Sequence, residues 1–270
     1  MTHRLLIRAL KTQLGNQLWR RLRGYRGLPA GNYADLPELV RRYAPGRSFA
    51  DIGCMWGVNG EYAFVAEEAG AHPVAGVDVF GPTPEFLSTK KERGSSVEFI
   101  LGDVSEPEVL RQIGPTQVVL CAGVLYHHPA PFDLLVALRA ICTETLIIRS
   151  STIPESPEMK NMAVFWPGLS DRQRKLWDKS KLGVGVQLGV STPFDTTAGY
   201  GNWFWGLTPS CFRSLVRLAG FEPIEDLPEP WAHTMVCRAV KPPFVHRVPS
   251  PSEAAALGEA VSRTGEARPQ

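Results

Sequence analysis

Short apolar segments and segments of helical pattern alternate along residues 48–151, and this alternation restricts the fold more than any other feature of the sequence. The apolar runs predict strands, and the segments between them have the spacing of amphipathic helices. Alternating strands and helices predict a largely parallel sheet with helices on both faces. The predicted strands are 48–54, 72–80, 97–104, 116–123 and 145–151, and the predicted helices are 58–69, 83–93, 107–113 and 131–142.

The sequence changes character after residue 151 before the alternation resumes. Residues 153–206 form a long polar and aromatic stretch, which predicts an insertion after the fifth strand that acts as a lid. A predicted helix at 209–219, closed by Gly220, and predicted strands at 221–226 and 233–240 follow. We therefore expect a seven-stranded, mostly parallel α/β domain over 35–241, with its ligands at the carboxyl ends of the strands.

The composition fits one large domain in a reducing compartment. The chain has 270 residues, of which 44% are hydrophobic and 21% charged, and these values exclude a mostly disordered or fibrous protein. The longest apolar run covers 118–125, which is far shorter than the roughly 18 residues of a membrane span. Five scattered cysteines without Cys-x-x-Cys spacing argue against a disulfide framework and a zinc site, and favour a cytoplasmic location.

The two ends of the chain differ from its middle. Residues 1–34 hold seven Lys or Arg and no acid, and leucine recurs there every four residues, which predicts a basic amphipathic helix. Such a helix could pack on its own domain, on a dimer mate or on a membrane surface. The rest of the chain holds 22 bases against 27 acids, which argues against a nucleic-acid partner. Residues 242–270, rich in Pro, Ser, Ala and Glu, predict a flexible tail.

Acidic residues lie at the ends of three consecutive predicted strands. Asp51 precedes a glycine turn that contains Gly53 and Gly57, and such a turn lets backbone approach a nucleotide-like ligand. Met55 stands where the dinucleotide fingerprint needs glycine, so a pyrophosphate site is not predicted. A single aspartate at a strand end is often only a helix cap or turn former. Three at three consecutive strand ends, with Asp78 and Asp103 completing the set, favour a ligand site.

These segments together resemble the class I methyltransferases that use S-adenosylmethionine and have a Rossmann-like fold. The resemblance covers about 45–240 and includes Asp51-Ile-Gly-Cys, Gly-Val-Asp78, Gly-Asp103 and the run Cys-Ala-Gly-Val-Leu-Tyr-His-His-Pro at 121–129. It implies that the turn 53–57 holds the methionine part of the cofactor, with Asp51 near its amino group. It further implies that Asp78 binds the ribose, that Asp103 and the backbone of Val104 bind the adenine, and that residues 121–125, beginning with Cys121, line the methyl donor.

Two subgroups of this class are also similar. The Leu-Tyr-His run and the later Asn-Trp-Phe-Trp-Gly-Leu-Thr-Pro at 202–209 resemble a group that includes a bacterial tRNA wobble-uridine carboxymethyltransferase. His128 stands where that enzyme would have arginine, so a carboxylated cofactor is not inferred. The chain is also similar to a mycobacterial sugar 1-O-methyltransferase of methylmannose polysaccharide synthesis.

Two adjacent histidines follow the predicted fourth strand, where the resemblance places the methyl group. A hydroxyl acceptor must lose its proton, and histidine is the usual base at neutral pH. His127 is the preferred base and His128 the second candidate, while a turn-stabilising pair before Pro129 is the alternative. No acidic pair or His-x-x-x-His spacing follows this strand, so a metal is not predicted, although Glu155, Glu158 and Asp195 could together bind Mg²⁺.

The aromatic residues of the insertion indicate the acceptor. Their rings could stack on a sugar, or they could form a small secondary core. The predicted substrate-binding residues are Tyr126, Trp166, Asp195, Tyr200, Asn202, Trp203 and Trp205. The leading interpretation is sugar or oligosaccharide O-methylation. A tRNA-modifying methyltransferase, a natural-product O-methyltransferase and a non-catalytic binding module are the alternatives.

Overall fold

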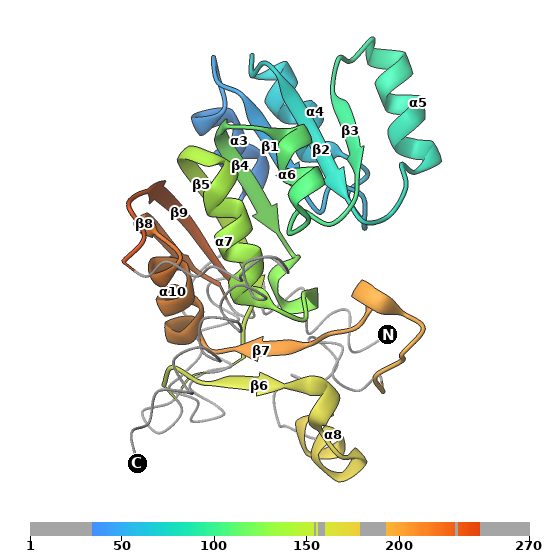
Figure 1. Cartoon of the computed structure of the whole chain (residues 1–270). Coiled ribbons are helices and arrows are strands. Elements are labelled where there is room, and N and C mark those ends of the chain that lie inside the picture. The colour runs from blue at the N-terminus through green and yellow to red at the C-terminus, as the bar shows by residue number, and fades with distance from the viewer. Residues whose placement is uncertain (1–33, 154, 156–159, 179–192, 230–231, 244–270) are drawn as a thin grey trace, which may run out of the picture.

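In the computed structural model, seven strands form one sheet in the order β3-β2-β1-β4-β5-β9-β8 (Figure 1). The structure describes residues 34–153, 155, 160–178, 193–229 and 232–243. β1 to β5 are parallel, whereas β9 is antiparallel to both β5 and β8. This confirms the predicted Rossmann-like fold. The strands are β1 (Phe49–Ile52), β2 (Val74–Asp78), β3 (Glu98–Leu101), β4 (Thr116–Ala122), β5 (Cys142–Ser151), β8 (Phe221–Pro228) and β9 (Ala232–Ala239).

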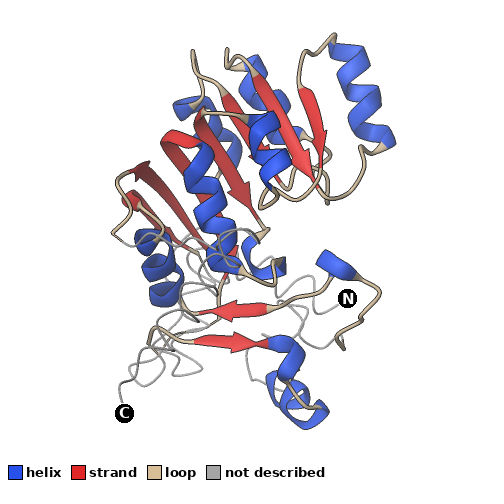
Figure 2. Ribbon diagram, in the orientation of Figure 1, coloured by secondary structure: helices blue, strands red, loops and turns tan. Residues whose placement is uncertain are grey.

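Helices cover both faces of the sheet (Figure 2). One face packs against α3 (Leu36–Tyr43), α4 (Glu61–Glu68) and α5 (Pro84–Arg93). The other packs against α6 (Pro107–Ile113), α7 (Pro131–Ile141) and α10 (Pro209–Leu218). Because side chains alternate along a strand, Phe49 contributes to the first core, whereas Ala50 and Ile52 contribute to the second.

The helix boundaries follow from local capping. Thr83 accepts a hydrogen bond from the Phe86 N–H at 3.1 Å and Pro84 occupies the first turn, so α5 begins where the sequence predicts. α4 begins at Glu61, three residues later than predicted. The reason is that Asn59 and Gly60 have positive φ angles of 49° and 76°, which a right-handed helix excludes. The sequence analysis missed α3, which Asp35 caps through the Glu38 N–H.

The described part of the insertion forms a second, two-stranded sheet beyond the carboxyl ends of the parallel strands (Figure 1). β6 (Ala163–Phe165) pairs antiparallel with β7 (Trp205–Leu207). Between them in sequence come the 3-10 turns η2 (Trp166–Gly168) and η3 (Gly199–Gly201) and the helix α8 (Asp171–Asp178). A side chain at Gly206 would lie 2.4 Å from the Trp166 ring, so the small sheet packs closely over this buried indole.

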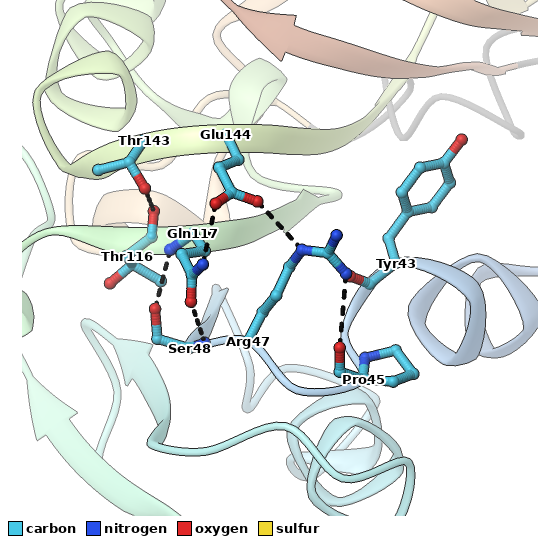
Figure 3. Close-up of polar contacts among 8 residues, drawn as sticks. All are labelled: Tyr43, Pro45, Arg47, Ser48, Thr116, Gln117, Thr143 and Glu144. Carbon is cyan, nitrogen blue, oxygen red and sulfur yellow. Dashed lines mark hydrogen bonds and ion pairs between the residues drawn. The ribbon is translucent and has the colours of Figure 1, made fainter.

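A polar network joins the amino ends of β1, β4 and β5 (Figure 3). These strand ends lie away from the insertion, which is beyond the carboxyl ends (Figure 1). The Gln117 side chain accepts from the Ser48 N–H at 3.1 Å and donates to Glu144 at 2.9 Å. Arg47 donates to the other oxygen of Glu144 at 3.0 Å. These bonds fix the register of the three strands that carry the site at their other end.

Several predictions concern parts of the chain outside this description. The predicted basic helix lies in residues 1–33 and most of the predicted tail in 244–270, and both stay predictions. Within the residues that are described, no helix is long and apolar enough to cross a membrane.

Candidate active site

A cavity of about 310 Å³ lies at the carboxyl ends of the parallel strands. Its walls come from the turn after β1, the ends of β2 and β3, the segment after β4 and the η3 turn. Among the predicted site residues, the structure brings the following to its wall: Gly53, Asp78, Asp103, Val104, Tyr126, His127, His128 and Tyr200. The cavity therefore lies at the carboxyl ends of the strands, where the sequence analysis expects the ligands.

The turn after β1 approaches the segment after β4 very closely at Gly53. This residue has φ +80°, and a Cβ there would lie 2.2 Å from Cγ2 of Val124. Only glycine fits such a position without displacement of a neighbour. Met55, which stands where the dinucleotide fingerprint needs glycine, is 1% exposed and packs in the core. Its bulk is thus directed away from the cavity, and the turn keeps its open path.

Asp78 at the end of β2 organises this turn and also faces the cavity. Its Oδ2 accepts the Met55 N–H at 2.7 Å, and its Oδ1 accepts the Phe80 N–H at 2.9 Å. A carboxylate can accept about four hydrogen bonds. Asp78 can therefore also bind two hydroxyl groups of a ligand in the cavity, as vicinal ribose hydroxyls require.

Asp51 is the most deeply buried acid near the turn. It is 2% exposed, and its Oδ2 has no hydrogen-bond partner among the described residues. Burial, and then the negative charge of Asp78, raise its pKa to about 8. A cationic group beside Asp51 would restore the carboxylate and satisfy the unpaired oxygen. Asp51 does not line the cavity, so a ligand in the cavity does not reach this oxygen in the described structure.

Asp103 lies at the centre of a hydrogen-bonded cluster. One oxygen accepts from the Ser105 N–H at 2.8 Å, and the other accepts from the Tyr200 hydroxyl and lies 3.5 Å from Nε2 of His128. Burial raises the pKa of Asp103, but the bonds from His128, Tyr200 and Ser105 outweigh burial and hold the pKa well below its usual range. Asp103 is therefore ionised, and Tyr200 links it to the insertion.

His127 is held in one tautomer by the insertion. Its Nδ1 lies 2.7 Å from the backbone oxygen of Asn202, and because a carbonyl can only accept, Nδ1 must carry the proton. Nε2 is then left with a lone pair that can accept a proton. Burial lowers the pKa of His127, and the bond to Asn202 only partly opposes this effect. The ring is thus neutral at pH 7.

His128 is oriented differently from its neighbour. It is 5% exposed, and its Nδ1 lies 2.8 Å from the Ala130 carbonyl oxygen. Its Nε2 is directed at Asp103. These contacts hold the ring in the wall of the cavity and are those of a structural partner of Asp103.

Other predicted residues do not line the cavity in the described structure. Asp51 and Cys121 are buried behind its wall, whereas Gly57 is exposed outside it. Of the predicted run 121–125, residues 122–124 line the cavity. The ring of Trp203 packs 4.2 Å from that of Tyr126. Trp166 is 2% exposed, and Trp205 donates to the Pro129 carbonyl at 2.9 Å. Three of the five predicted aromatic substrate residues, Trp166, Trp203 and Trp205, therefore pack against the protein and do not line the cavity.

Two polar residues of the insertion also turn away from the cavity. The Asn202 side chain bonds to the backbone of Asp195 and Gly199, and the Asp195 side chain bonds to Thr197. Direct substrate contact was predicted for both Asn202 and Asp195, and in this structure they instead stabilise the loop 195–202. A short polar side chain in a glycine-rich loop is commonly used in this way.

Among the cavity-lining residues that the sequence analysis missed are Trp56, Tyr62, Phe80 and Arg149. Trp56 is 61% exposed, and its ring lies 5.7 Å from His127 and 5.5 Å from Phe80. Arg149 near the end of β5 pairs at 2.9 Å with Glu229, which is fully buried. Arg149 could have been predicted, because it lies near the carboxyl end of the fifth strand, where ligands of such sheets bind. Trp56 could have been predicted as a cavity residue, because it is an aromatic residue inside the glycine turn.

The described residues contain no group of three or more His, Cys, Asp or Glu side chains that could hold a metal ion. Of the three acids that could have combined, Glu155 accepts from the Ser210 N–H at 3.1 Å and Asp195 bonds to Thr197. Glu158 lies outside the described residues.

Solved structures share the fold of this chain. The chain matches an N1-methyltransferase for 1,6-didemethyltoxoflavin from Burkholderia thailandensis, solved with S-adenosylhomocysteine, at a TM-score of 0.51 and 17% identity over 77% of this chain and 79% of that one. It has the fold of S-adenosylmethionine-dependent methyltransferases.

Two further matches show how widely this methyltransferase fold is used. The N-terminal domain of EvdMO1, solved in the presence of SAH and D-fucose, has a TM-score of 0.50 and 15% identity over 83% of this chain and 96% of that one. The [4+2]-cyclase SpnF has a TM-score of 0.51 and 14% identity over 84% and 93%. No protein-family model and no curated protein sequence matches the chain. The reaction must therefore be argued from the site and not from the fold.

Proposed function

We propose that the chain is an S-adenosylmethionine-dependent O-methyltransferase that acts on a hydroxyl of a sugar or oligosaccharide. The observation that carries this proposal is that one cavity combines the Gly53 turn, the acids Asp78 and Asp103, and a histidine whose tautomer leaves Nε2 as a proton acceptor. A binding module would need the first three features and would gain nothing from the fourth.

The residues of the cavity fit the cofactor part by part. The turn at Gly53 lines the cavity and would hold its methionine portion, with Asp51 buried behind this turn. Asp78 has acceptor capacity left for the ribose hydroxyls. Asp103 with the Val104 backbone would hold the adenine. When bound, S-adenosylmethionine supplies an activated methyl group, so the protein has mainly to align the acceptor and exclude water.

His127 would take the proton from the acceptor hydroxyl at Nε2. Its lowered pKa keeps the ring neutral, and therefore basic, at pH 7. The Nδ1 proton stays on the bond to the Asn202 carbonyl, which stabilises the positive charge that forms on the ring. His128 is already engaged with Asp103 and Ala130, and this favours His127 as the base.

The aromatic residues that line the cavity favour a ring-shaped acceptor such as a sugar. Trp56 and Tyr126 supply aromatic surface beside His127, while Phe80 packs on Trp56 and Tyr200 packs on His128. Hydroxyl-rich rings bind well between aromatic faces and a few polar groups. EvdMO1, which matches in fold, was solved with D-fucose present. A mannoside, as used by the similar mycobacterial enzyme, is the specific acceptor to test first.

A methyl-transfer screen with labelled S-adenosylmethionine tests the proposal. The acceptors are methylmannosides and other sugars, small phenols and tRNA, and the wild-type chain is compared with His127→Ala. We expect label in a sugar, and loss of that label in the variant. Label only in phenols would indicate a natural-product methyltransferase, and label only in tRNA a tRNA-modifying one. No transfer to any acceptor by folded protein that binds the cofactor would contradict catalysis.

A further inference from the structure

Asn202 directs all of its side-chain hydrogen bonds into its own loop. It is 8% exposed, and its Oδ1 accepts the Asp195 N–H at 2.9 Å. Its Nδ2 donates to the carbonyl oxygens of Asp195 at 2.6 Å and Gly199 at 3.0 Å. A buried amide with three bonds to backbone cannot rotate without leaving polar groups unpaired. The main chain at Asn202 is therefore fixed by its own side chain.

The same residue presents its backbone carbonyl to His127. This oxygen accepts the Nδ1–H of the ring at 2.7 Å, and it is the contact that selects the tautomer. The loop that Asn202 fixes reaches the cavity at two further points. Tyr200 donates to Asp103, and Gly201 packs on Trp56 so closely that a Cβ would lie 3.3 Å from the indole.

We infer that Asn202 is a positioning residue, whose side chain holds the carbonyl that keeps His127 in the Nδ1–H tautomer with Nε2 as the acceptor. The catalytic consequence rests on the proposed role of His127, but the tautomer does not. Asn202 acts through His127 and has no contact with substrate in this assignment.

The near-isosteric change Asn202→Asp tests this inference. It keeps the volume of the side chain but replaces the Nδ2 donor by a carboxylate oxygen, which the carbonyls of Asp195 and Gly199 would repel. Thr197→Ala is the matched control, because Thr197 lies in the same loop and bonds to the Asp195 side chain but not to Asn202. Asn202→Ala serves as a second variant that removes all three bonds.

The first readout is the ring-nitrogen NMR signals of His127 in histidine-labelled protein, assigned through their loss in His127→Ala. We expect a protonated Nδ1 in the wild type and in Thr197→Ala, and mixed tautomers in both Asn202 variants. An Nδ1–H tautomer that persists in folded Asn202→Asp and Asn202→Ala would overturn the inference.

The second readout is turnover. With the tautomer no longer fixed, kcat should fall about 10- to 100-fold, as misplacement of a catalytic group commonly does. The affinity for S-adenosylhomocysteine should fall less than kcat, because Asn202 reaches the cofactor site only through the contact between Tyr200 and Asp103. A changed tautomer with full kcat would confirm the positioning of the ring and refute its role as the base. The two proposals therefore fail in different experiments.

Discussion

Replacing Gly53 by alanine should destabilise the protein through two separable effects. Gly53 has φ +80°, and an L-residue in the left-handed region costs about 1–2 kcal/mol. The new Cβ would also lie 2.2 Å from Cγ2 of Val124, far inside the roughly 3.5–4 Å of a normal carbon contact. Overpacking of this kind costs about 1–3 kcal/mol more. We therefore expect a loss of about 2–5 kcal/mol in the free energy of unfolding.

Urea unfolding followed by circular dichroism measures this loss, and the chain offers a matched control. Gly57 has a similar φ of +75°, but nothing lies within 4 Å of its Cβ position, so Gly57→Ala should show the backbone cost alone. In a double-mutant cycle, Val124→Ala should relieve Gly53→Ala and leave Gly57→Ala unchanged. Equal losses for the two glycine variants, or no relief from Val124→Ala, would refute the close approach.

Four further predictions concern the site and the residues that support it. His127→Ala should lower kcat about 10²–10⁴-fold with donor affinity retained, and His128→Ala should cost less; the reverse order would exchange their roles. Because the pKa of His127 is lowered and the base must be neutral, the rate in the wild type should fall only as pH drops below about 6.5, and this limb should be absent from His127→Ala. Glu229→Ala should cost about 1.5–3 kcal/mol in urea unfolding, since it removes a fully buried carboxylate that accepts hydrogen bonds from Arg149 and Thr234; a loss below about 0.5 kcal/mol would contradict this. Hydrogen exchange around Tyr200 should slow when S-adenosylhomocysteine binds next to Asp103, and unchanged exchange would separate the loop from the cofactor.

The sheet could be predicted because its strands are short apolar runs separated by helical patterns. Every strand from β1 to β5 overlaps its predicted range, and the acids at strand ends were found because parallel strands end at one edge. The late start of α4 was missed because the positive φ of Asn59 is set by the turn and not by hydrophobic spacing. The short strands β6 and β7 lack the length that a periodic pattern needs.

The roles of the insertion residues could not be read from the sequence. Whether an aromatic ring lines a cavity or fills a core depends on its tertiary neighbours. Trp166 is buried in a core, whereas Tyr200 lines the cavity. The bond that fixes the tautomer of His127 joins residues 75 positions apart through a backbone carbonyl, which no residue type reveals. Asn202 was predicted to bind substrate, but its side chain forms hydrogen bonds within its own loop.

Calorimetric titration with S-adenosylhomocysteine tests the central claim most directly, because it requires neither an acceptor nor turnover. The wild type should bind this ligand and should not bind NAD, and Asp78→Asn should weaken binding about 10- to 100-fold through the loss of charged hydrogen bonds worth about 1.5–3 kcal/mol. Asparagine keeps an acceptor oxygen for only one of the Met55 and Phe80 N–H groups, so the variant is first shown to be folded by circular dichroism and urea unfolding. Absence of binding by folded wild-type protein, or equal affinity in the variant, would contradict the cofactor site described for this cavity.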